Sequence, residues 1–88
     1  MRVGELYELL KDGIQRRCVG PDGLHYAAFT PPHNRRDLWL IRINRRTGKW
    51  ATGNHAKTRR ANLRPEKSAD YDWEKAERRF AEALVFLG

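Results

Sequence analysis

Cysteine and long apolar runs are scarce in this chain of 88 residues. The single cysteine, Cys18, excludes an internal disulfide and leaves a zinc site without its usual thiolates, as is typical of a protein in a reducing compartment. The longest apolar runs, 38–41 and 83–87, are far too short to span a bilayer, and no charged and then apolar leader opens the chain. We therefore expect a cytoplasmic protein that is not embedded in a membrane.

Chain length and composition limit the number of domains. A chain of 88 residues has room for one domain, because two smaller ones would each bury too little apolar surface. Hydrophobic residues make up 40% of the chain and charged residues 33%, but three Trp, three Tyr and three Phe argue against disorder. We expect a single folded domain over residues 1–88.

Positive charge is concentrated in the middle of the chain. Residues 1–30 carry four basic and four acidic side chains, residues 31–67 carry eleven and two, and residues 68–88 carry three and five. A basic cluster among aromatic residues attracts nucleic-acid phosphates, although such charges can also simply solvate a surface. The predicted nucleic-acid-binding residues are Arg35, Arg36, Arg42, Arg45, Arg46, Lys49, Trp50, Lys57, Arg59, Arg60 and Arg64.

The first thirty residues predict a helix and a hairpin. Apolar side chains recur at helical spacing from Val3 to Ile14, and Gly13 is a natural C-terminal stop. Residues 14–19 and 24–30 are β-prone, and the sequence Gly-Pro-Asp-Gly at 20–23 favours a tight turn between them.

The basic middle predicts a loop, a second hairpin and a long connection. The consecutive prolines in residues 31–37 indicate an exposed loop. Residues 38–43 form the strongest predicted strand, and a turn at 44–49 leads to a short partner strand at 50–52. Residues 53–69 lack periodicity, so we expect a basic, partly flexible connection there.

The C-terminal residues predict a helix that Asp70 or Asp72 would cap. Its apolar stripe consists of Trp73, Ala76, Phe80, Ala83, Leu84 and Leu87. The complete prediction is an α+β domain of order αββββα, an antiparallel sheet with the N- and C-terminal helices packed on one of its faces, since both apolar stripes then share one core.

Two tryptophans lie in or beside the basic strands. An exposed aromatic side chain on a sheet can stack on an unpaired base, but a tryptophan in so small a domain is more often part of the core. Trp50 is the better candidate for stacking because it directly follows a polar turn. Trp39 can likewise be a stacking residue or part of the core.

Histidines are the first candidates for acid–base chemistry, but no metal site is predicted. The spacing of His25, His33 and His55 with Cys18 matches no metal signature. No catalytic residue and no cofactor are predicted from these side chains.

The segment Gly23-Leu24-His25-Tyr26, which follows a short helix and a strand, resembles the start of HicA-type toxins. The resemblance covers about the first thirty residues and implies an mRNA-cleaving enzyme with a double-stranded-RNA-binding-domain fold, in which His25 would be catalytic. This chain has Leu24 where the family has serine and Asp22 where it has a basic residue.

Three functions follow from the sequence. The first is a small basic protein that binds RNA or DNA, mainly through phosphates contacted by residues 35–67. The alternative is a small inhibitor or adaptor, of the kind phages use against host defences, that binds a nucleoprotein machine. The second alternative is a HicA-like ribonuclease.

Overall fold

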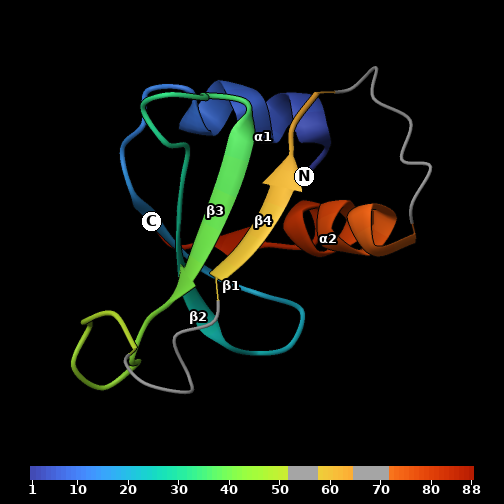
Figure 1. Ribbon diagram of the computed structural model, residues 1–88. Coiled ribbons are helices and arrows are strands. Elements are labelled where there is room, and N and C mark those ends of the chain that lie inside the picture. The colour runs from blue at the N-terminus through green and yellow to red at the C-terminus, as the bar shows by residue number, and fades with distance from the viewer. Residues whose placement is uncertain (52–57, 65–71) are drawn as a thin grey trace.

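The computed structural model describes residues 1–51, 58–64 and 72–88, except for the side chains of residues 72–74. Figure 1 shows two helices behind an antiparallel sheet. The predicted α+β class and the order αββββα are confirmed, and a further strand of two residues follows the second helix. The elements are α1 (Val3–Leu10), β1 (Arg16–Val19), β2 (His25–Phe29), β3 (Asp37–Arg42), β4 (Thr58–Asn62), α2 (Asp72–Glu82) and β5 (Val85–Phe86).

The sheet has the strand order β4-β3-β2-β1-β5 and every neighbouring pair is antiparallel. The predicted first hairpin is present as β1 and β2, with Cys18 opposite Tyr26. Gly23 closes its turn, because its N–H donates to the carbonyl of Gly20 at 2.9 Å and its φ of 78° is one that glycine adopts without strain.

Both helices bury their apolar stripes against the same face of the sheet. Leu6 and Leu10 of α1 are fully buried in one cluster with Leu38 and Leu40 of β3, and the cluster also contains Leu84, which follows α2. The prediction that the two terminal helices share one core is therefore confirmed. The opposite face of the sheet carries neither helix, as Figure 1 shows from that side.

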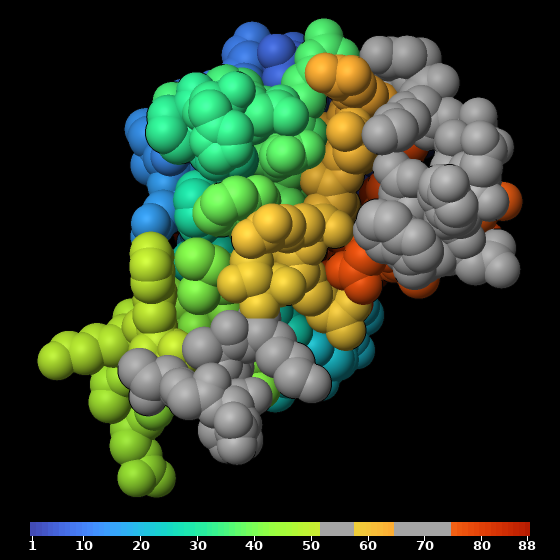
Figure 2. Space-filling view, in the orientation of Figure 1, coloured from blue at the N-terminus to red at the C-terminus, as the bar shows by residue number. Residues whose placement is uncertain are grey.

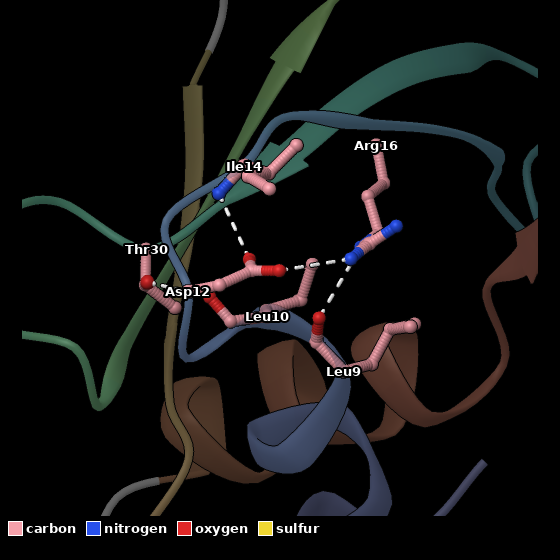
Figure 3. Close-up of polar contacts among 6 residues, drawn as sticks. All are labelled: Leu9, Leu10, Asp12, Ile14, Arg16 and Thr30. Carbon is pink, nitrogen blue, oxygen red and sulfur yellow. Dashed lines mark hydrogen bonds and ion pairs between the residues drawn. The ribbon is translucent and has the colours of Figure 1, made fainter.

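Helix α1 ends earlier than the sequence predicts. It stops at Leu10, and Ile14, predicted to complete its apolar stripe, lies outside the helix with 59% of its surface exposed. Side chains from the sheet satisfy the last carbonyls: the Thr30 hydroxyl donates to the Leu10 carbonyl at 2.8 Å, and Arg16 Nε donates to the Leu9 carbonyl at 3.2 Å (Figure 3). These contacts fix the end of the helix on the sheet.

The fourth strand lies further along the chain than predicted. Among the described residues of the expected partner strand at 50–52, a single bridge joins Trp50 to Ile43. Strand β4 instead falls within the segment expected to be a connection, where Ala61 pairs with Leu38. The apolar signal of β4 is weak, because Ala61 has polar neighbours along the strand. Pairing with β3 therefore decides where this strand lies. Residue 52 of the expected strand and residues 53–57 and 65–69 of the expected connection lie outside the described residues.

Helix α2 ends at Glu82, so the prediction of a helix reaching Leu87 was wrong. Ala81 and Leu84 are buried, whereas Leu87 is 46% exposed. The chain turns after the helix, and the Leu87 N–H donates to the Arg17 carbonyl at 2.9 Å beside β5. Pairing with β1 thus replaces the last helical turn. No helix in the described ranges is long and apolar enough to cross a bilayer.

Candidate nucleic-acid interface

The face of the sheet opposite the helices, which we call the open face, carries a row of aromatic and basic side chains. Phe29 of β2, Trp39 of β3 and Arg60 of β4 occupy directly opposed positions on three neighbouring strands, so their side chains share this face. Arg17 of β1 lies on the same face by its pairing with Ala27. Figure 2 views this face and shows side chains of β3 and β4 at its surface.

Trp39 is the centre of the row. The Arg60 guanidinium carbon lies 4.4 Å from the Trp39 ring centroid, a distance typical of a cation–π contact. The rings of Phe29 and His33 meet the Trp39 ring edge to face, at centroid distances of 5.9 and 6.2 Å. These three contacts hold the half-buried indole in one orientation. The open face therefore presents an ordered aromatic surface next to a cation.

The basic turn, residues 44–49, extends beyond the end of β3, at the lower left of Figure 2. Its shape comes from Asn44, whose Oδ1 accepts hydrogen bonds from the N–H groups of Arg46 at 2.9 Å and Thr47 at 3.3 Å. Gly48 completes the turn with a φ of 71°, and its N–H donates a hydrogen bond to the Asn44 carbonyl at 2.8 Å. The turn displays three exposed cations and, beside it, an indole that is 51% exposed: Arg45, Arg46, Lys49 and Trp50.

Arg59 points to the opposite side of the sheet from Arg60. Its Nη1 donates to Glu77 Oε1 at 2.8 Å, and its guanidinium carbon lies 4.0 Å from the Phe80 ring centroid. Partial burial disfavours the charged form of Arg59, but Glu77 and Tyr26 outweigh it and raise the pKa of the guanidinium above its usual value. Among the predicted binding residues, Arg59 therefore belongs to the contact between β4 and α2.

Tyr26, which interacts with Arg59, also forms a hydrogen bond with Asp22. The Tyr26 hydroxyl donates to Asp22 Oδ2 at 2.6 Å. Burial and then this hydrogen bond raise the pKa of Tyr26 to about 12. Burial acts to raise the pKa of Asp22, but the hydrogen bonds from Tyr26 and from the Leu24 N–H lower it below its usual value. The turn between β1 and β2 is thereby tied to the helix side of the sheet.

The other predicted cations lie at the end of the sheet remote from the basic turn. Arg35 Nη1 donates to the Thr30 carbonyl at 2.8 Å, and Arg36 lies 5.2 Å from the Tyr7 ring centroid. Arg64 is exposed just after β4. Lys57 lies outside the described residues. The predicted nucleic-acid-binding residues are therefore divided among the basic turn, the open face, the helix side and this remote end.

Carboxylates and cations are distributed unequally between the two sides of the sheet. The described carboxylates of the helix side lie on α1, just after it, on α2, or in the turn between β1 and β2: Glu5, Glu8, Asp12, Glu77, Glu82 and Asp22. On the described part of the open face, Asp37 at the start of β3 is the one carboxylate, at the end remote from the basic turn. Among the described residues, the basic turn and the open face therefore carry more cations than carboxylates.

A hollow of about 580 Å³ lies beside the basic turn, where β2 begins and β3 ends. Arg42, a predicted binding residue, lines it together with Arg45 and His25. The sequence indicated Arg42 by its charge alone, and it gave no sign that His25 would line the same hollow.

The described residues contain neither a metal site nor an activated thiol. No group of three or more His, Cys, Asp or Glu side chains lies close enough together there to hold a metal ion. Cys18 is buried, and burial raises the pKa of its thiol to about 12, so the reactive thiolate is scarce at neutral pH.

Sequence reasoning missed several residues of this surface. Trp39 was not preferred over Trp50, because a tryptophan within a strong strand is equally consistent with the core. Arg17 and Phe29 were not selected, although alternation along each strand would have placed them on one face once the pairing was known. Comparisons of the chain with protein-family models, curated proteins and solved structures found no match.

Proposed function

We propose that the protein binds RNA or DNA with the open face of its sheet and the basic turn, mainly through contacts to phosphates. The observation that carries the proposal is the separation of charge: the basic turn exposes Arg45, Arg46 and Lys49, and Arg60 lies on the open face, on the other side of the sheet from the carboxylates of the two helices. A surface of one sign of charge attracts a polyanion and keeps its cations available for phosphates.

The aromatic surface supports the same function. Trp39 is held beside Arg60, and Trp50 is half exposed beside the basic turn. Bases of a single strand can stack on such rings, whereas bases of a duplex are already stacked on each other. We therefore expect single strands to bind more tightly than duplexes of the same length.

A salt series tests the proposal. The affinity for labelled single-stranded and double-stranded RNA and DNA would be measured by fluorescence anisotropy at several salt concentrations. The logarithm of the association constant should fall linearly with the logarithm of the salt concentration. The test variant replaces three cations of the basic turn: Arg45→Gln, Arg46→Gln and Lys49→Gln. It should reduce the slope by up to about three units, roughly one for each phosphate that the variant no longer binds.

The matched control removes the same charge from exposed residues of the helix side: Lys11→Gln, Lys75→Gln and Arg79→Gln. It should leave the slope nearly unchanged. Equal reductions of the slope in the two triple variants would show that only net charge matters and would contradict the proposed surface. Little binding of any oligonucleotide at physiological salt would contradict the function itself and favour an inhibitor of a nucleoprotein machine.

A further inference from the structure

Trp39 and Trp50 lie on the same face of the sheet. The antiparallel bridge places Trp50 directly opposite Ile43, so these two side chains share a face. Strand pairing continues as far as Ile43, because its N–H donates to the His25 carbonyl at 2.9 Å. Ile43 is four positions after Trp39, and side chains at even separations along a strand point to the same side. Trp50 therefore belongs to the open face, like Trp39.

The two indoles mark two ends of the open face. At one end Trp39 lies in a row with Phe29 and Arg60, and at the other Trp50 lies in a row with Ile43. The rows are four residues apart along the direction of β3, which is about 13 Å at about 3.3 Å per residue. Successive nucleotides of a stacked strand are about 3.4 Å apart, so about four steps cover this distance, and fewer suffice when the bases are spread apart.

The surface between these two rows is apolar in the middle and polar at its borders. Ala27 and Ile41 lie directly opposite each other there, flanked by Arg17 on β1 and Thr58 on β4. The two central side chains offer no hydrogen-bond donor to a phosphate, but they offer bases an apolar surface to lie against. Phosphates therefore find their partners at the borders of the open face, and bases find theirs in the middle.

The two ends present different surfaces to a base. Trp50 is 51% exposed, so a base can stack on its ring directly. The Arg60 guanidinium carbon lies over the Trp39 ring, 4.4 Å from its centroid, so Trp39 supports the guanidinium from one side. Bases stack on guanidinium planes as well as on aromatic rings, and the N–H edge of the same group can donate to a phosphate. Trp39 and Arg60 thus form one stacking platform, and Trp50 forms the other.

From these observations we infer that a single strand of nucleic acid runs along β3, with one base stacked on the platform of Trp39 and Arg60 and another on Trp50. The bases between them lie over Ala27 and Ile41, and the phosphates face the cations at the borders. This two-platform site rests on the proposed function. It adds a requirement that phosphate contacts alone do not impose, because the strand has to be long enough to reach both platforms, about three to five nucleotides.

Strand length tests the two-platform site. Fluorescence anisotropy would give the affinity for single strands of oligouridylate and oligodeoxythymidylate, from two to eight nucleotides long, at one salt concentration. Affinity should rise steeply at the length that reaches both platforms, because the second base then binds as part of a linked ligand. Beyond that length it should rise gradually. The steep rise should be absent in Trp50→Leu, and a gradual rise throughout, equal in the variant and the unaltered protein, would overturn the inference.

Substitutions that keep the net charge separate stacking from phosphate contacts. Trp50→Leu should weaken binding of the longest strand about tenfold, as expected for one lost base stack, and should leave the salt slope unchanged. Arg60→Lys keeps the charge but removes the planar surface, so it should also weaken binding without changing the slope. Trp50→Phe keeps a ring and should retain most of the affinity. Because Trp50 is half exposed, both of its variants should unfold at nearly the same urea concentration as the unaltered protein.

Arg59→Lys is the matched control. It makes the same change in the neighbouring residue of β4, whose guanidinium packs over Phe80 on the helix side, and it should leave the affinity unchanged. Equal losses in Arg59→Lys and Arg60→Lys, or an unchanged affinity in Trp50→Leu, would overturn the two-platform site and leave the proposed function standing. Failure of the unaltered protein to bind any strand would contradict the proposed function, and the two-platform site with it.

Discussion

Arg59 and Arg60 are adjacent in the sequence, but their side chains lie on opposite faces of the sheet. The Arg59 guanidinium pairs with Glu77 and packs over Phe80 on the helix side, whereas the Arg60 guanidinium packs over Trp39 on the open face. Strand geometry imposes this difference, because successive side chains of a strand point to opposite faces. Two residues that composition treats as equivalent therefore have different roles.

The first prediction uses this pair as its own control. Arg60→Gln should weaken nucleic-acid binding and lower the salt slope by about one unit, because the variant binds one phosphate fewer. Arg59→Gln removes the same charge but should have a smaller effect on the slope. It should instead lower the free energy of unfolding by about 1 kcal/mol, because it removes the half-exposed ion pair and the cation–π interaction with Phe80.

Anisotropy in a salt series and urea unfolding would measure the two effects. Reversed results, with Arg60→Gln affecting mainly stability and Arg59→Gln mainly binding, would contradict the assignment of faces to functions.

The second prediction concerns the core under α1. Leu6 is fully buried, so Leu6→Ala should lower the free energy of unfolding by about 2–5 kcal/mol, a large part of the stability of a small domain. Ile14, which sequence periodicity assigned to the same stripe, is 59% exposed. Ile14→Ala should change the stability by no more than about 0.5 kcal/mol. Urea denaturation of both variants decides the matter, and similar decreases in stability would mean that α1 extends as periodicity predicted.

The third prediction concerns pH. Tyr26 has a pKa of about 12 in the folded chain against an ordinary value of 10, so folding favours its neutral form. This contribution to stability is complete below about pH 10 and is lost as the pH rises through about 12. The phenolate absorbance of the folded protein should include a late titration that Tyr26→Phe removes.

Asp22→Asn should shift that titration downward but not to the ordinary value, because burial is the larger cause of the raised pKa. An unchanged titration in Asp22→Asn would mean that the hydrogen bond between Tyr26 and Asp22 does not contribute.

The fourth prediction separates binding from RNA cleavage. General acid–base cleavage of RNA needs two groups that exchange protons at the reacting atoms. His25 carries the one imidazole among the described residues that line the hollow, and no carboxylate accompanies it there. We therefore expect purified protein to leave labelled RNA intact with or without a chelator. Cleavage without metal that disappears in His25→Ala would reverse this expectation in favour of a HicA-like ribonuclease.

Some features of the molecule were determined by the sequence itself, because they depend on local patterns. Helical spacing of apolar residues indicated α1, and a glycine-rich turn between β-prone runs indicated the hairpin of β1 and β2. A dense apolar run indicated β3. Each signal lies within about ten residues, so local propensity and periodicity sufficed. The gathering of positive charge in the middle of the chain was equally a property of the sequence.

Tertiary structure alone decided which cations belong together. Strand β4 has few apolar residues, and its position depends on pairing with β3, over a separation that no local pattern covers. That pairing sends Arg59 to the helix side and Arg60 to the open face, beside Trp39. That His25 and Arg42 both line one hollow also depends on the antiparallel pairing of β2 with β3. Register joins residues far apart in the chain, and the burial of one face of the sheet against the helices fixes it.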